Sequence, residues 1–164
     1  MNESLVSNTR ISATLEAHKC YDLLCGQRQI TAEVASKRKE LFGNPKKTIF
    51  SDTVQAFYVA AIVGHFKQDG KRPKIEDVQK EGLILLQHWE RQEKKDLRKA
   101  LTFLIKLDYK AKEATEVLQI VAELADVGIQ EIRDKVTESA DTGMFDSIID
   151  FLRKETDKKG VLLQ

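Results

Sequence analysis

The chain has 164 residues, which is the usual size of one domain and is enough to bury a core without disulfides or metal ions. Hydrophobic residues make up 41% and charged residues 32%, so there is enough apolar surface to offset chain entropy, which excludes a largely disordered protein. The 27 basic and 26 acidic residues nearly cancel. Binding to nucleic acid or anionic lipid would therefore depend on local basic patches.

The sequence indicates a cytoplasmic protein with no membrane association. The N-terminus lacks the basic segment and apolar run of a secretory signal, and the longest apolar stretch, 56–64, is too short to cross a bilayer. Cys20 and Cys25 are the only cysteines, and without an export signal we expect both thiols to be reduced.

Three helices are predicted in the first half, because only two prolines and eight glycines interrupt the chain. They span 11–25, 30–42 and 52–67. Gly43 suits a C-terminal cap of the second helix, and Ser51 suits the N-cap of the third. The third helix is apolar almost all round, so we expect it to form the centre of the core.

Apolar residues recur every three or four positions in the second half, which is the helical period. The predicted helices lie at 78–89, 97–107, 114–125, 129–136 and 145–152. Gly128 is expected to break or cap the third of them, and the residues 141–143 form a turn before the last.

The predicted fold class is all-α, a single compact domain of seven or eight helices over residues 11–155. A flexible N-terminus, 1–10, precedes it and a charged tail, 156–164, follows it. A short strand pair around 10–15 and 48–50 is an alternative that would leave this class unchanged.

Metal, cofactor and catalytic motifs are not expected. His18, Cys20 and Cys25 lie within eight residues, but a zinc site needs four ligands, usually in two close pairs, and no second pair exists. We therefore predict that the thiols are core residues. The chain has neither a nucleophile-elbow serine motif nor a phosphate-binding loop motif, so a non-enzymatic protein without cofactors is predicted.

The histidines leave an enzymatic alternative open. His65 and His88 lie on different predicted helices, and a carboxylate such as Asp69 is near the first of them. General acid–base catalysis would require such groups to meet in a cleft. The alternative function is therefore a small helical hydrolase-type enzyme that uses His65 or His88 with nearby carboxylates; the simpler interpretation is that each histidine packs or caps a helix.

Basic residues form two clusters that would make a phosphate-binding patch if they met in space. The simpler interpretation is that they solvate helix ends. A third group, 91–99, is diluted by Glu93 and Asp96. The predicted nucleic-acid-binding residues are Lys37, Arg38, Lys39, Lys46, Lys47, Lys67, Lys71, Arg72 and Lys74.

Several segments resemble one family. Thr48-Ile49-Phe50 precedes the apolar stretch 53–64, and Gly70-Lys71-Arg72 follows it. Residues 123–132 combine small residues, a glycine and an amphipathic pattern, and 145–152 is the last predicted helix. This order is similar to that of small helical proteins encoded beside bacterial DNA phosphorothioation (Dnd-type) defence genes.

The resemblance implies an accessory role in a bacterial anti-phage defence or DNA-modification system, with no catalytic residues to carry over. It does not extend to residues 1–45 or 73–110. The leading hypothesis is a non-enzymatic interaction subunit that binds a protein partner, with DNA as an additional candidate ligand. A regulatory subunit of a larger oligomer is a further alternative, and it predicts an exposed apolar patch on the isolated chain.

Overall fold

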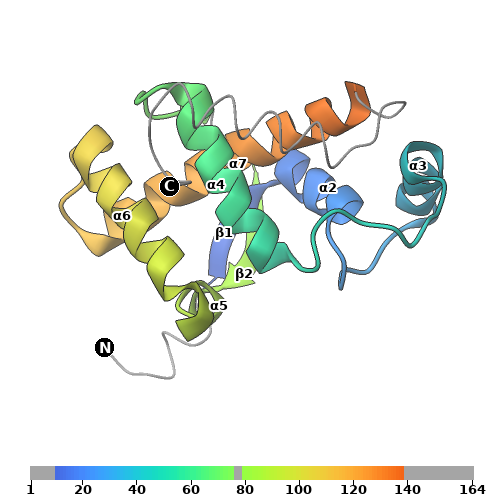
Figure 1. Ribbon diagram of the computed structural model, residues 1–164, viewed down its shortest axis with the longest axis horizontal. Helices are drawn as coiled ribbons and strands as arrows, with labels where there is room; N and C mark the ends of the chain where they lie inside the picture. The colour runs from blue at the N-terminus through green and yellow to red at the C-terminus, as the bar shows by residue number, and fades with distance from the viewer. Residues whose placement is uncertain (1–9, 76–78, 139–164) are drawn as a thin grey trace.

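The computed structural model describes residues 10–75 and 79–138. Its elements, in chain order, are β1 (Arg10–Thr14), α2 (Leu15–Leu24), α3 (Ala32–Phe42), α4 (Thr53–Gln68), β2 (Lys80–Leu85), α5 (Leu86–Trp89), the short 3₁₀ turn η1 (Gln92–Lys94), α6 (Lys95–Tyr109) and α7 (Ala114–Glu138). The helices α4 and α7 cross at the centre, with α6 at one end of the molecule and α3 at the other (Figure 1).

The all-α prediction is wrong, because β1 and β2 form a two-stranded antiparallel sheet. The described residues hold six α-helices, not seven or eight. A helix was predicted over 78–89 from four apolar residues at helical spacing. Instead, Lys80–Leu85 is a strand, and only the single turn Leu86–Trp89 is helical. The partner strand lies about 70 positions earlier in the chain, so this pairing left no trace in the local pattern.

The first predicted helix, 11–25, also begins with a strand. Residues 10–14 were recognised as a possible strand, but the suggested partner, 48–50, was wrong. Phe50 instead forms a single parallel bridge with Cys25, just after α2 ends. The segment before α4 is thereby held against the end of α2, and β1 is left to pair with β2.

Side-chain caps fix where the helices start. Thr14, Thr31 and Asp52 are the N-caps of α2, α3 and α4, and each side chain accepts a hydrogen bond from the backbone N–H three residues later. Asp52 is the cap of α4, so the assignment of that role to Ser51 was wrong. Gly43 ends α3 in the left-handed conformation with φ of 75°, as predicted.

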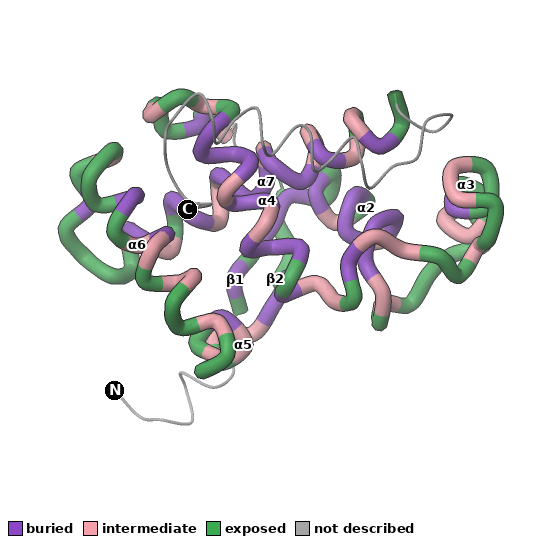
Figure 2. Tube along the Cα trace, in the orientation of Figure 1, coloured by how far each residue is buried: buried purple, intermediate pink, exposed green. Residues whose placement is uncertain are grey.

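The helix α4 is the buried centre of the core, as its apolar composition predicted. Its main neighbour is α7, which runs without a break from Ala114 to Glu138. The predicted break or cap at Gly128 was therefore wrong, and two predicted helices are one. Figure 2 shows the buried residues concentrated along these two helices, while α3 and α6 are exposed over much of their surface.

Two glycines let α4 and α7 approach backbone to backbone. A Cβ atom on Gly64 would lie 1.9 Å from the carbonyl oxygen of Leu124, and one on Gly128 would lie 1.7 Å from that of Ala60. Real Cβ atoms do not approach this closely, and the opposing atoms are backbone, which cannot rotate away. Gly128 is therefore required by packing and not by its backbone conformation.

A buried carboxylate ties the start of α2 to the middle of α7. The Asp126 carboxylate accepts hydrogen bonds from the backbone N–H and the hydroxyl of Thr14, and it is 4% exposed. Burial raises the pKa of Asp126, and the two hydrogen bonds from Thr14 oppose that rise. Because Thr14 also caps α2, one side chain of α7 fixes the point where β1 becomes α2.

Several predictions concern residues outside those described: most of the N-terminal segment 1–10, the turn at 141–143, the helix at 145–152 and the tail 156–164.

Alanine at Gly64 or Gly128 is expected to lower the free energy of unfolding by about 3 kcal/mol or more, because a methyl group would force the helices apart. Urea unfolding followed by circular dichroism measures this. In an unpacked helix the same change would stabilise by up to about 1 kcal/mol, so even the sign is informative. Thr115→Ala, at an exposed position of α7, is the matched control and should change stability by less than about 0.5 kcal/mol.

Candidate interaction surfaces

Arg38, one of the predicted nucleic-acid-binding residues, is buried. Its guanidinium donates hydrogen bonds to the backbone carbonyls of Asp22, Leu23 and Cys25, at the end of α2. Helix C-termini leave carbonyls without intrahelical partners, and a cation there also complements the helix dipole. Arg38 therefore serves as a C-terminal cap that fastens α3 to α2, and the Nε and Nη2 donors of this buried side chain are already used within the protein.

Three other predicted residues form ion pairs with carboxylates of the protein itself. Lys37 pairs with Glu33 one turn earlier, at 3.4 Å. At the other cluster, Lys67 pairs with Glu131 at 3.4 Å. Arg72 pairs with Glu123 through two nitrogens, at 2.7 and 3.0 Å. Lys67 and Arg72 thus connect the end of α4 to α7.

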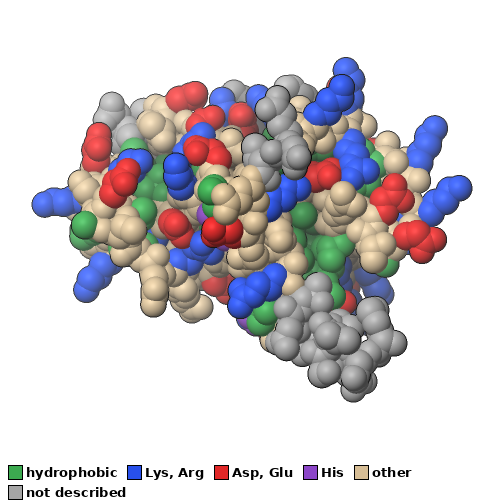
Figure 3. Space-filling model, turned by 180° about the vertical axis from the view of Figure 1, so that it is seen from behind, with side chains coloured by type: hydrophobic (Ala, Val, Ile, Leu, Met, Phe, Trp, Pro, Cys, Tyr) green, Lys and Arg blue, Asp and Glu red, His purple; other side chains and the backbone are tan. Residues whose placement is uncertain are grey.

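The two basic clusters do not meet. Residues 37–47 lie on α3 and the loop after it, at one end of the molecule, whereas residues 67–74 follow the far end of α4 (Figure 1). The view from behind shows basic and acidic side chains interspersed (Figure 3). Five predicted residues remain exposed without an ion pair among the described residues: Lys39, Lys46, Lys47, Lys71 and Lys74.

The histidines do not converge either. His65 is 4% exposed; its Nε2 lies 3.2 Å from the Asp108 carboxylate and its Nδ1 lies 3.3 Å from the Tyr109 hydroxyl. His88 lines a cavity beside Thr53, at the opposite end of α4. Twelve residues separate Thr53 from His65, or about 18 Å along the helix axis. The arrangement joins the ends of α4 and α6 through His65, and it leaves His88 in a different environment.

His18 has both ring nitrogens in hydrogen bonds. The Arg28 guanidinium lies 3.2 Å from Nδ1, and because arginine can only donate, Nδ1 accepts. Nε2 then carries the proton and donates to the Glu81 carbonyl at 3.0 Å. No group of three or more potential metal-ligating side chains is placed to hold an ion within the described residues.

Cys20 and Cys25 are buried, unbridged thiols, as the sequence predicted. The Cys20 sulfur accepts a hydrogen bond from Arg133 at 3.3 Å. Burial raises the pKa of each thiol to about 12, although the nearby arginines oppose the rise.

The most exposed large apolar side chains among the described residues lie on α6. Phe103 is 65% exposed and Leu107 is 62% exposed. They are four positions apart, one helical turn, and point away from the core-facing side of α6 that carries Leu101 and Ile105. Lysines surround the pair at exposed positions. We call the group formed by Lys99, Phe103, Lys106, Leu107 and Lys110 the α6 outer face.

A cavity of about 410 Å³ adjoins this face, between α6 and α7. Lys99, Phe103 and Lys106 of α6 are among the residues that line it, together with Trp89 of α5 and Leu118 of α7. The α6 outer face therefore combines exposed apolar groups, unpaired lysines within the described chain and a hollow of side-chain size.

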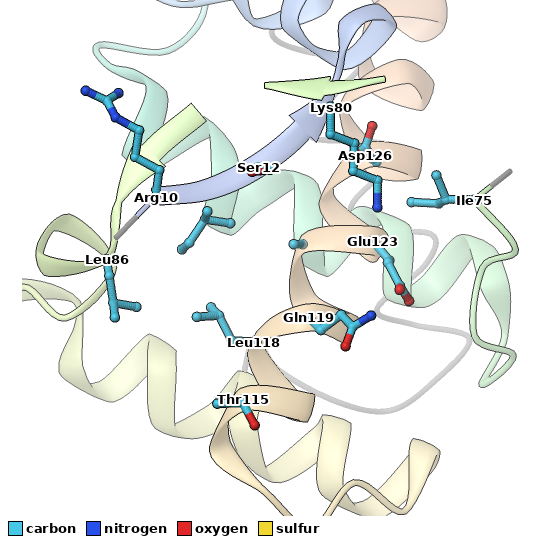
Figure 4. A pocket seen from close by; sticks show the side chains of 12 residues that line it. Arg10, Ser12, Ile75, Lys80, Leu86, Thr115, Leu118, Gln119, Glu123 and Asp126 are labelled. Carbon is cyan, nitrogen blue, oxygen red and sulfur yellow. The ribbon is translucent and has the colours of Figure 1, made fainter. Parts of the chain in front are cut away.

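A second cavity, of about 420 Å³, lies between the sheet, α5 and α7. Apolar side chains line much of it, including Ile75, Leu86 and Leu118, and Lys80 lies at the edge with Glu123 and Asp126 (Figure 4). Leu118 lines both cavities, so the two adjoin along α7.

Sequence reasoning missed the α6 outer face. It placed Leu107 on the core stripe of the predicted helix 97–107 and left Phe103 out. A helical projection contained part of the signal: with about 3.6 residues per turn, Phe103 lies roughly opposite Leu101, whereas Leu107 lies about 120° from Leu101 and closer to Leu104.

No family model, curated protein or solved structure matches the chain. No helix within the described residues has the length and apolar character needed to cross a membrane.

Replacing Arg38 by Met is expected to lower the free energy of unfolding by about 3 kcal/mol, since three carbonyls at the end of α2 would lose their donor. Thermal and urea unfolding measure the change. Lys39→Met is the matched control on the same helix; Lys39 is exposed, and its loss should cost less than about 0.5 kcal/mol. Equal effects of the two variants would contradict the capping role.

Neither cysteine should react with iodoacetamide at pH 8 in the folded protein. A thiol with a pKa about four units above the solution pH is only about one part in ten thousand thiolate, which is the reactive form. Mass spectrometry of the folded and urea-unfolded chain measures labelling, and the unfolded chain is the control. Rapid labelling of either cysteine under native conditions would contradict the described burial.

Proposed function

We propose that the chain is a non-enzymatic interaction subunit that binds a protein partner through the α6 outer face. The observation that carries the proposal is the exposure of Phe103 and Leu107 beside a cavity. Two large apolar side chains one turn apart are a common way for a helix to contact another protein, and burying them on association is favourable.

The chemistry of the face supports an acidic partner with an apolar anchoring side chain. Lys99, Lys106 and Lys110 have no ion pair within the described part of the chain, so carboxylates of a partner would meet uncompensated positive charge. The cavity bordered by Trp89 and Phe103 has room for one large side chain. An acidic amphipathic helix satisfies both requirements.

The role in a bacterial anti-phage defence or DNA-modification system is part of the same proposal, and the resemblance to the Dnd-associated proteins supports it. We place this role in the cytoplasm. DNA is a secondary ligand in the proposal. The exposed lysines form two small separated groups, so each would contact only a few phosphates and its binding would be weak and sensitive to salt.

The double variant Phe103→Ser with Leu107→Ser is expected to reduce partner recovery about tenfold or more in an affinity pull-down from the native cell. Charge reversal at Lys99 and Lys106 should weaken recovery and make it less sensitive to salt. The matched control is Ile30→Ser, a partly exposed apolar residue (37%) elsewhere on the surface, which should recover the partner normally. Recovery that is unchanged in the double variant would contradict the proposal.

Nuclease treatment separates the protein-binding and DNA-binding parts. A partner retained after nuclease treatment supports direct protein binding. Recovery of nucleic acid alone, lost at moderate salt, would contradict protein binding through α6. In that case Lys46→Glu with Lys47→Glu, and Lys71→Glu, would identify which basic group contacts phosphate.

A further inference from the structure

Three arginines and a histidine from distant parts of the sequence meet around one polar cavity of about 350 Å³. Arg10 comes from the start of β1, Arg28 from the loop after α2, His88 from α5 and Arg91 from the turn before η1. Nothing in the sequence groups these four residues, because they lie far apart in the chain; Arg91 alone belongs to a basic group, 91–99.

Arg28 is fixed in place by the protein. It pairs with Asp22 at 2.6 Å, donates to the Thr53 hydroxyl at 3.3 Å and donates to His18 at 3.2 Å. The side chain of Arg28 is 18% exposed, so its orientation is determined before any ligand arrives. A guanidinium that is already oriented loses little rotamer freedom when it forms a further contact.

Arg10 reaches the cavity across a glycine. A Cβ atom on Gly82 would lie 2.5 Å from Cδ and 3.1 Å from Cβ of Arg10, so a side chain at position 82 would force Arg10 to shift where it crosses β2. The ladder has an irregularity between Ile11 and Ser12 at this point. The guanidinium of Arg10 points away from the apolar cavity that its strand also lines (Figure 4).

Positive charge is in excess around the cavity. Asp52 is the one carboxylate among its described lining residues, and that carboxylate already accepts the Gln55 N–H as the cap of α4. Neither Arg10 nor Arg91 has an ion pair within the described residues. A hollow that concentrates like charges raises the local concentration of anions.

We propose that this cavity binds a phosphomonoester. Arginine presents paired N–H donors that match phosphate oxygens. The charge of Arg28 is already balanced by Asp22, so the two guanidiniums without an ion pair among the described residues, those of Arg10 and Arg91, provide the two positive charges that suit a dianion better than a carboxylate of single charge. The cavity has space for the phosphate and part of the group that bears it. Such a ligand is either a free nucleotide or the 5′-phosphorylated end of a nucleic acid, which share this chemistry.

The probe is adenosine 5′-monophosphate, and adenosine is the unphosphorylated control. Binding is measured from the chemical shifts of backbone amides by nuclear magnetic resonance. Saturable shifts at Gln27, Val54 and Leu85, which line the cavity, are expected with the nucleotide and not with adenosine. Arg91→Ala should weaken the affinity about tenfold or more, because it removes a charge-assisted contact. Lys95→Ala, at a nearby exposed position outside the cavity, should not.

Gly82→Ala tests the same site without removing any charge. This variant is expected to displace the Arg10 side chain and to weaken the affinity for the nucleotide. The amide resonances of residues away from the cavity should stay unchanged. Displacement of the nucleotide by a 5′-phosphorylated oligonucleotide, but not by its unphosphorylated form, would identify a nucleic-acid end as the ligand; displacement by nucleotides alone would identify the free form. No saturable shift with millimolar nucleotide, or equal affinity in Arg91→Ala, would overturn the proposal.

Discussion

The close approach of α4 and α7 is the constraint on which the other elements depend. Because Gly64 and Gly128 carry no side chain, the two backbones touch where they cross, and the larger side chains pack on either side of the contact. This fixes the direction of α7 over 25 residues. The long helix also contacts α2, α6 and β1. It therefore supports both the sheet and α6, the helix that bears the α6 outer face.

Polar contacts at the ends of elements set the remaining geometry. Asp126 holds Thr14, so the strand β1 is fixed where it turns into α2, and Arg10 at the opposite end of the strand is directed toward the polar cavity. Arg38 holds α3 on the end of α2 in a similar way. Buried polar groups are costly unless they are hydrogen-bonded; the Asp126 carboxyl accepts from two donors of Thr14, and Arg38 donates to three carbonyls.

The sequence correctly predicted the features that neighbouring residues in the chain determine. The apolar composition of 53–68 was sufficient to recognise α4 as buried, and Gly43 was sufficient to end α3. It failed where distant residues decide. The strand at 80–85 depends on pairing with Arg10–Thr14, and Gly128 stays helical because its role is to admit the carbonyl of Ala60. Neither cause lies within the window that a periodicity argument examines.

The polar cavity and the α6 outer face also depend on residues that are distant in the sequence, and the two sites are linked to each other. The runs of lysine in the sequence indicated clusters that the fold keeps apart. The basic residues that do meet, around the polar cavity, are single arginines far apart in the sequence. The polar cavity and the cavity beside the α6 outer face both border the short segment 88–91, through His88 and Arg91 on one side and Trp89 on the other. Arg98 of α6 donates to the carbonyls of Trp89 and Arg91, at 2.9 and 3.0 Å. The position of α6 and that of Arg91 are thereby coupled, because the same guanidinium holds both.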